Sequence, residues 1–317
     1  MNAPEKWRSD RLEDAILDAT WAYYHEGRTQ TEIAEKLGLS RATVVNYLTE
    51  ARRREIVRIT LDPEVFTGHR LAGALRDRFG LIDVAVVPDS GPETADRVAR
   101  MTADWLPTLL GPGDMLGVAW GETVYRVAEA APRLALLDVT IVQLLGSRPA
   151  ALGFAAETCS ATLARRFGAA CINLHAPLVL SRPELARDLA AEPGIAAQLD
   201  AVRACTKVLF APGTCESDSH IVQTGLLTPD TLKAKVADGA RAVICGRLID
   251  ADGAPIPTEI EARMLGISLD DMRAKPMGVM VGSGPDRIAP MQAALRGGFA
   301  THLATSAGTA ERLLDGE

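Results

Sequence analysis

Residues 29–59, TQTEIAEKLGLSRATVVNYLTEARRREIVRI, decide the fold of the first part of this chain. Thr29 can accept hydrogen bonds at the start of a helix over Gln30–Leu37, and Glu32 completes a capping box with it. The break at Gly38-Leu39-Ser40 then ends this helix, because glycine tolerates the left-handed backbone of a helix terminus. The stretch therefore begins with one short, well-delimited helix.

A second helix is expected from Arg41 to about Arg54, with Ser40 as its cap. Two helices joined by a glycine-containing turn predict a helix-turn-helix. An amphipathic helix is also expected upstream, ending near Gly27, because apolar residues recur there at helical spacing. These residues are Leu12, Ala15, Ile16, Ala19, Ala22 and Tyr23.

The polar face of the Arg41–Arg54 helix has the chemistry of DNA recognition. Arginine can bridge guanine, asparagine can bridge adenine, and the first turns of such a helix meet the bases. We therefore assign Arg41, Thr43 and Asn46 to base contacts and the run 52–54 mainly to phosphates. The full set of candidate DNA-contacting residues is Thr29, Gln30, Ser40, Arg41, Thr43, Asn46, Tyr47, Arg52, Arg53 and Arg54. The alternative is a solvated three-helix cap without a DNA partner.

The chain is expected to have two domains, residues 1–61 and 62–317. Alternation of apolar residues in Ile56–Leu61 predicts a strand, and Asp62-Pro63 breaks the chain before a helix from about Glu64 to Phe79.

Beyond this point, short apolar runs alternate with helical patterns, as in a parallel sheet with helices on both faces. The expected strands are 82–87, 115–119, 140–145, 170–174, 208–210, 242–244, 278–281 and 300–304, and helices are expected over 95–110 and from Glu122. The fold class is therefore α/β, with a doubly wound, mostly parallel sheet behind the helix-turn-helix. Ligands of such sheets bind beyond the carboxyl ends of the strands. Three loops are candidates there: 117–123, the loop from Gln143 through Ser147, and 282–287.

Composition limits the class of protein. The 317 residues are 47% hydrophobic and 24% charged, which is typical of a globular chain. No apolar run is long enough to cross a membrane and no secretory signal is evident, so a cytoplasmic protein is expected. The net charge of −7 leaves room for a locally basic DNA-binding surface. The five scattered cysteines lack metal-ligand spacing and are expected to be mostly buried.

The sequence resembles the SorC family of sugar-responsive regulators over about residues 10–315. The resemblance is carried by the 29–59 stretch and by LGVAWGETV (116–124), CGRLIDADG (245–253), LGISLDDMR (265–273) and AALRGG (293–298). It implies a fold similar to sugar-phosphate isomerases and a homo-oligomer, dimeric or tetrameric. It also implies affinity for operator DNA that is controlled by a sugar, polyol or sugar phosphate.

The sequence departs from the family pattern at several positions. Glu122 stands where threonine or a basic residue is common, Arg287 where lysine is common, and Gln223 near where some relatives have arginine. Ala242-Val243 replaces a frequent Gly-Asp. Because a carboxylate repels a phosphate, we expect an uncharged or weakly anionic polyol or sugar, with Glu122 accepting hydroxyl hydrogen bonds. A Glu122 that merely points to solvent at a helix start is the alternative. The candidate effector-binding residues are Gly121, Glu122, Thr123, Gln143, Ser147, Gln223, Arg247 and Arg287.

An isomerase-like enzyme is the main alternative function, because the resemblance implies a fold similar to isomerases; isomerisation needs a positioned general base and an electrophile. The possible bases are Asp114, Glu122, Asp218, His220 and Asp250. His175 is a candidate pocket residue and Lys207 a candidate Schiff-base former, but a satisfied loop histidine and a solvated strand-edge lysine are the interpretations that we favour. Asp218-Ser219-His220 has the composition of a triad, but a triad is defined by geometry. We predict no catalytic residue, metal or cofactor, since no recognisable motif is present. A pure scaffold would not need the arginine-rich helix.

Overall fold

The computed structural model describes residues 3–57, 63–148 and 154–316. It divides into two compact units, Met1–Asp62 and Pro63–Glu317.

The first unit is a three-helix arrangement of α1 (Ala3–Tyr24), α2 (Gln30–Leu37) and α3 (Arg41–Arg53). Apolar residues from all three helices form its core: Ala19, Ala22, Ile33, Ala34, Val44 and Leu48. The predicted helices and turn are therefore confirmed. Ile56 and Val57 form a bend, and the rest of the predicted strand, 58–61, lies outside the described residues.

The second unit is built on a seven-stranded sheet in the order β1-β10-β9-β5-β2-β3-β4, with every pair parallel. The strands are β1 (Asp83–Val87), β2 (Met115–Val118), β3 (Thr140–Gln143), β4 (Ala170–Ile172), β5 (Lys207–Phe210), β9 (Met277–Val281) and β10 (His302–Ser306). The predicted fold class is confirmed.

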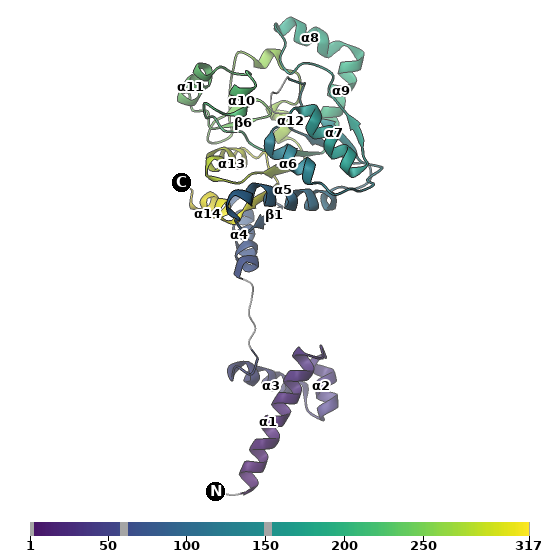
Figure 1. The fold of residues 1–317 in the computed structure, drawn as a ribbon, viewed down its shortest axis with the longest axis vertical. Coiled ribbons are helices and arrows are strands. Elements are labelled where there is room, and N and C mark those ends of the chain that lie inside the picture. The colour runs from purple at the N-terminus through teal and green to yellow at the C-terminus, as the bar shows by residue number, and fades with distance from the viewer. Residues whose placement is uncertain (1–2, 58–62, 149–153, 317) are drawn as a thin grey trace. The chain divides into compact units, whose positions relative to one another are not determined.

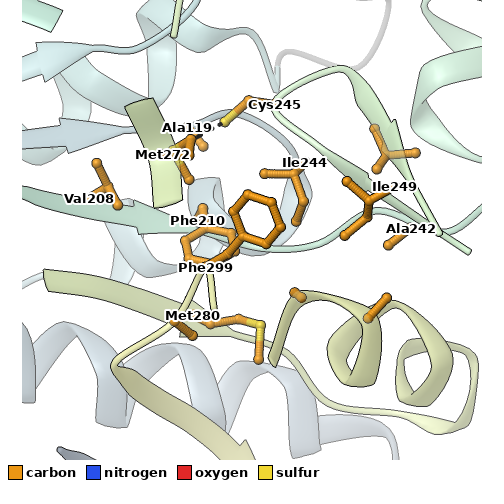
Figure 2. Packing of buried hydrophobic residues seen from close by; sticks show 14 of the residues in the cluster. Ala119, Val208, Phe210, Ala242, Ile244, Cys245, Ile249, Met272, Met280 and Phe299 are labelled. Carbon is orange, nitrogen blue, oxygen red and sulfur yellow. Dashed lines mark hydrogen bonds between the residues drawn. The ribbon is translucent and has the colours of Figure 1, made fainter. Parts of the chain in front are cut away.

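Alternating side chains of the central strands enter two different cores, because successive residues of a strand point to opposite faces. Val208 and Phe210 of β5 enter one apolar cluster, whereas Leu209 enters the other. Figure 2 shows Phe210 beside Phe299 and above Met280 in the first cluster.

Helices cover both faces of this sheet (Figure 1). On one face, α5 (Thr94–Trp105), α6 (Glu122–Ala130) and α7 (Ala156–Phe167) pack in succession. On the other, α4 (Pro63–Phe79) and α14 (Ala307–Asp315) pack together, and α13 (Ile288–Arg296) contacts α14. The remaining helices are α8 (Pro183–Ala191), α9 (Pro193–Ala204), α10 (His220–Gln223), α11 (Pro229–Ala237) and α12 (Leu269–Arg273).

A small antiparallel sheet changes the interpretation of one predicted strand. Ala242–Ile244 is strand β6, but it pairs with β7 (Arg247–Ile249) and then β8 (Pro255–Ile256) instead of joining the parallel sheet. The turn Cys245-Gly246 joins β6 to β7, with φ of 48° and 77°. Positive φ at both central residues of a two-residue hairpin matches the right-handed twist of strands, which explains the glycine.

At one point in the sheet, the chain leaves two neighbouring parallel strands toward opposite sides of the sheet. From β2 the chain moves outward to β3 and β4, whereas from β5 it moves the other way to β9 and β10. The loops that leave β2 and β5 therefore diverge, and such a switch point is where open α/β sheets form their ligand crevice.

Candidate functional site

A cavity of about 240 Å³ lies at this switch point, beyond the carboxyl ends of β2 and β5. The loops after β2, β5 and β9 and the β6–β7 turn all contribute to it. Its lining consists of residues 119–123, 154, 211–214, 218–221, 223, 243, 245–246 and 286–287. The sequence prediction of a site in the strand-end loops is consistent with this position.

The start of α6 forms one wall of the cavity. Gly121, with φ of 108°, caps the helix, and its carbonyl oxygen accepts from the Tyr125 amide at 2.9 Å. The first amides of a helix lack partners within the helix and carry partial positive charge, so they suit hydroxyl or anionic oxygens. Thr123 adds a half-buried hydroxyl to the same wall.

The charged groups of the lining are mostly acidic. Three carboxylates, Glu122, Asp218 and Asp286, accompany one cation, Arg287. Arg287 is already engaged, because its Nε lies 3.0 Å from Asp286 Oδ2 and its Nη1 donates to the Pro212 carbonyl at 3.2 Å. The lining therefore offers an anion little uncompensated positive charge.

Glu122 is exposed and forms an ion pair with Arg126, which also pairs with Asp96. Arg126 donates to Glu122 Oε1 through Nη2 at 2.5 Å and through Nε at 3.2 Å, and it also bonds to Asp96. Both bonds to Glu122 engage Oε1. Oε2 thus keeps lone pairs with which it can accept from a ligand hydroxyl, since each carboxylate oxygen has its own lone pairs.

Two cavity residues that sequence reasoning treated only as catalytic possibilities have unsatisfied polar atoms. Within the described part of the chain, Ser219 Oγ and His220 Nε2 are buried and have no hydrogen-bond partner. The two side chains therefore do not form the nucleophile–base pair of a triad. Burial lowers the pKa of His220 although Glu122 opposes this effect. No motif marks this loop, so sequence spacing alone could not find it.

The cavity brings together Gly121, Glu122, Thr123, Gln223 and Arg287 of the predicted effector residues. The other three, Gln143, Ser147 and Arg247, do not line it.

Those three residues make contacts elsewhere. Gln143 is fully buried and donates to the Leu145 carbonyl at 2.6 Å and to Ser147 Oγ at 3.3 Å. Arg247 is 9% exposed, and its Nη1 donates to the Cys245 carbonyl at 3.4 Å. Burial lowers the pKa of this guanidinium.

The remaining catalytic possibilities lie away from the cavity. His175 is exposed and its amide donates to Gln198, while Asp250 Oδ1 accepts amides of its own turn. Lys207 begins β5, at the opposite end of that strand from the cavity, and its Nζ bonds to Asp114 and to the Leu109 carbonyl. Lys207 is therefore engaged by these two acceptors and is not placed to form a Schiff base with a ligand in the cavity.

The Asp114–Lys207 pair instead stabilises the second unit. Burial raises the pKa of Asp114, but the hydrogen bond from Lys207 and further interactions hold it below its ordinary value. We expect Asp114→Asn to lower the free energy of unfolding by about 2 kcal/mol at pH 7. Because the folded pKa is depressed, this contribution is complete above about pH 4 and is lost as the pH falls through the folded value. Urea unfolding at pH 7 and pH 3 measures both effects.

Asp188→Asn is the matched control, since Asp188 is exposed on α8. A loss for Asp114→Asn that stayed equal at the two pH values would contradict the assigned ion pair.

In the first unit, both predicted helix caps are present. Thr29 and Glu32 form the capping box, with the Thr29 amide donating to Glu32 Oε2 at 2.8 Å. Ser40 Oγ accepts from the Thr43 amide at 3.1 Å, and the two hydroxyls are 2.8 Å apart. These hydroxyls primarily fix the start of each helix.

The start of α3 offers a prepared polar edge. Arg41 donates from Nε to Gln30 Oε1 at 3.3 Å, so α2 orients the arginine, and both residues border a groove that also includes Arg28. Asn46 is exposed one helical turn further along. Tyr47 is half-buried and packs against the three-helix core. This edge has the donor and acceptor groups that read base edges.

Arg53 and Arg54 at the end of α3 both pair with Glu50, and Arg54 Nη1 also lies 3.8 Å from Glu13 Oε1. Arg53 donates to Glu50 through Nε at 2.7 Å and through Nη2 at 2.6 Å, and Arg54 Nε donates to it at 2.5 Å. These hydrogen bonds lower the pKa of Glu50 to about 2, and the bond from Arg53 has the largest effect. Arg52 Nε donates to the Leu48 carbonyl at 3.4 Å.

The described residues also bear on the sequence predictions about cysteines, metal sites and membrane-spanning segments. Cys159, Cys205 and Cys245 are buried, Cys215 is half-buried and Cys171 is exposed, and all five are free thiols. Within ranges 3–57, 63–148 and 154–316, no group of three or more His, Cys, Asp or Glu residues could hold a metal ion. Among the helices of these ranges, none has the length and apolarity to cross a membrane.

Comparisons with known proteins match both units. Residues 64–315 match the family described as "Putative sugar-binding domain". The chain is 36% identical over 310 residues to "Uncharacterized transcriptional regulator YjhU" of Escherichia coli (strain K12), covering 95% of this chain and 94% of that protein. It is 28% identical over 305 residues to "Deoxyribonucleoside regulator" of Bacillus subtilis (strain 168), covering 94% and 96%.

Among solved structures, the full-length sorbitol operon regulator SorC from Klebsiella pneumoniae has the same fold. The TM-score is 0.74 at 23% identity, with 94% of this chain and 97% of that chain covered. These relatives and structural neighbours are transcriptional regulators and not enzymes.

Proposed function

We propose a role for this chain, which belongs to the SorC family of transcriptional regulators with a sugar-binding domain. Residues 1–61 bind operator DNA, and a carbohydrate-like effector in the switch-point cavity controls the affinity of the protein for that DNA. The observation that carries this role is the cavity itself, which lies beyond the carboxyl ends of β2 and β5 and is lined by polar groups of the loops after β2, β5 and β9. The helix-turn-helix supplies the second element that a regulator needs.

The charge of the lining favours an uncharged polyol or sugar as the effector. Three exposed carboxylates and one already engaged arginine leave a phosphate dianion little compensation, and like charges repel each other. Hydroxyl groups instead find acceptors on Glu122 and donors at the start of α6. A sugar phosphate, held by the α6 amides and Arg287, is the competing effector.

Regulation requires that the effector shift the equilibrium between two arrangements of the protein. We propose a homo-oligomer in the cytoplasm, with two helix-turn-helix heads reading half-sites an integral number of DNA turns apart. Effector binding changes how the heads are presented, and such coupling is typically about 1–3 kcal/mol.

A thermal-shift screen of the full-length protein tests the effector class. The panel is D-sorbitol, xylitol, D-ribose and 2-deoxy-D-ribose, each beside its terminal phosphate ester. A ligand at about 100 times its Kd contributes about 2.7 kcal/mol, which raises Tm by roughly 5–10 °C in a domain of this size. We expect an uncharged compound to give this shift and Glu122→Ala to reduce it.

Glu129→Ala is the matched control, because Glu129 lies on the same helix and does not line the cavity. Stabilisation by phosphate esters alone, or an unchanged sugar preference in Glu122→Ala, would contradict the uncharged effector. If an uncharged compound binds but leaves the affinity for operator DNA unaltered, the proposed regulation of DNA binding is contradicted.

A further inference from the structure

Ser219 and His220 form a polar pair at the start of α10, on the wall of the cavity. Ser219 is 7% exposed, and neither its hydroxyl nor His220 Nε2 has a hydrogen-bond partner in the described ranges. A buried polar atom without a partner is costly in free energy. A ligand that supplies the missing partner removes this cost on binding.

The imidazole is held in a defined orientation by Trp120. The two rings meet edge to face, with centroids 4.7 Å apart and planes at 74°. Trp120 is itself 9% exposed and directly precedes the Gly121 cap, so the loop after β2 supports the loop after β5 across the cavity. A ring fixed before binding loses little conformational freedom when a ligand arrives.

The charged groups that line the cavity with His220 come from three elements. Glu122 comes from α6, Asp218 from the same loop as His220, and Asp286 and Arg287 from the turn before α13. Desolvation outweighs the attraction of Glu122 for an imidazolium, so the pKa of His220 lies below its ordinary value of 6.5. At pH 7 the ring is therefore neutral and offers hydrogen bonding without charge.

We propose that Ser219 and His220 are the hydroxyl-recognition pair of the cavity, and that the uncharged imidazole makes this regulator select polyols or sugars over their phosphate esters. The inference rests on the proposed function and refines it by assigning the discrimination to one side chain. A cation at position 220 reverses the discrimination, because it compensates one of the three carboxylates and attracts a phosphate.

Titration calorimetry of the full chain at pH 7.5 tests the pair with the same four compounds and their esters. His220→Gln is expected to weaken binding of the uncharged compounds by about tenfold, since a hydrogen bond is lost or misplaced. His220→Lys is expected to weaken them further and to raise the affinity for a phosphate ester relative to its parent by about tenfold. His175→Gln is the matched control, because His175 is exposed and does not line the cavity.

A measurement on the unaltered protein guards against misfolded variants. We expect the His220 ring, followed by NMR, to titrate with a midpoint below 6.5 and to shift its resonances when an uncharged compound saturates the protein. Wild-type binding with unchanged ring resonances, or equal affinities in His220→Gln and wild type, overturns the inference and leaves the proposed function standing. Failure of all eight compounds to bind wild type contradicts both.

Discussion

Arg41→Ala is expected to lower operator affinity by about 10- to 100-fold while lowering affinity for random DNA by less than about threefold. Arg41 lies at the start of α3, oriented by Gln30, where a recognition helix meets base edges. Asn46→Ala is expected to behave likewise, since Asn46 is exposed on the same helix. Losing a base contact removes discrimination, whereas the phosphate contacts that hold any DNA remain.

Arg53→Ala is the informative comparison, because this arginine lies at the other end of α3 and is assigned to phosphates. It should weaken specific and random binding by similar factors and flatten the salt dependence. The operator is first selected from a random DNA pool with the wild-type protein, and each variant is then titrated at two salt concentrations. Equal losses on both DNAs for all three variants would refute the assignment.

Phe210→Ala is expected to lower the free energy of unfolding of the second unit by about 3–5 kcal/mol, or Tm by roughly 10 °C. Phe210 ends β5 and is 1% exposed, packed beside Phe299 and Met280 (Figure 2). Truncation leaves a cavity directly beneath the switch point, in an interior that relaxes only partly. Urea unfolding followed by circular dichroism measures the loss.

The matched control is Phe66→Ala, which removes the same side chain from a site on α4 that is 50% exposed. We expect a change within about 0.5 kcal/mol there. Similar losses for the two variants would show that Phe210 is not a core residue.

The sequence was most informative where local chemistry determines local structure. Thr29, Glu32 and Ser40 define helix starts through their own side chains, so the first unit could be predicted closely. The parallel sheet followed from the alternation of buried strands with helices. The pairing of strands was harder to predict. Ala242–Ile244 is a strand as expected, yet its partner is β7. The sequence had no hairpin signal there, because the two-residue turn begins with Cys245, a residue type that rarely adopts positive φ.

The candidate site was predictable only in outline. A strand end followed by glycine and a helix start marked Gly121, Glu122 and Thr123, which do line the cavity. Gln143 also ends a strand, but its side chain turns into the protein to bond to Leu145. His220 reaches the cavity through a loop without regular pattern, and such a path depends on tertiary packing that no single-sequence motif encodes.

Glu50 gives the recognition helix a counterion of its own. If Arg53 and Arg54 contact phosphates as proposed, each phosphate must displace the Glu50 carboxylate, which is attached to the same helix and cannot diffuse away. The displaced carboxylate stays beside the DNA and repels it. On the proposed assignment of Arg41 and Asn46 to base contacts, this repulsion moderates non-specific binding, so that a DNA sequence that engages both residues is distinguished more clearly from the rest of a genome.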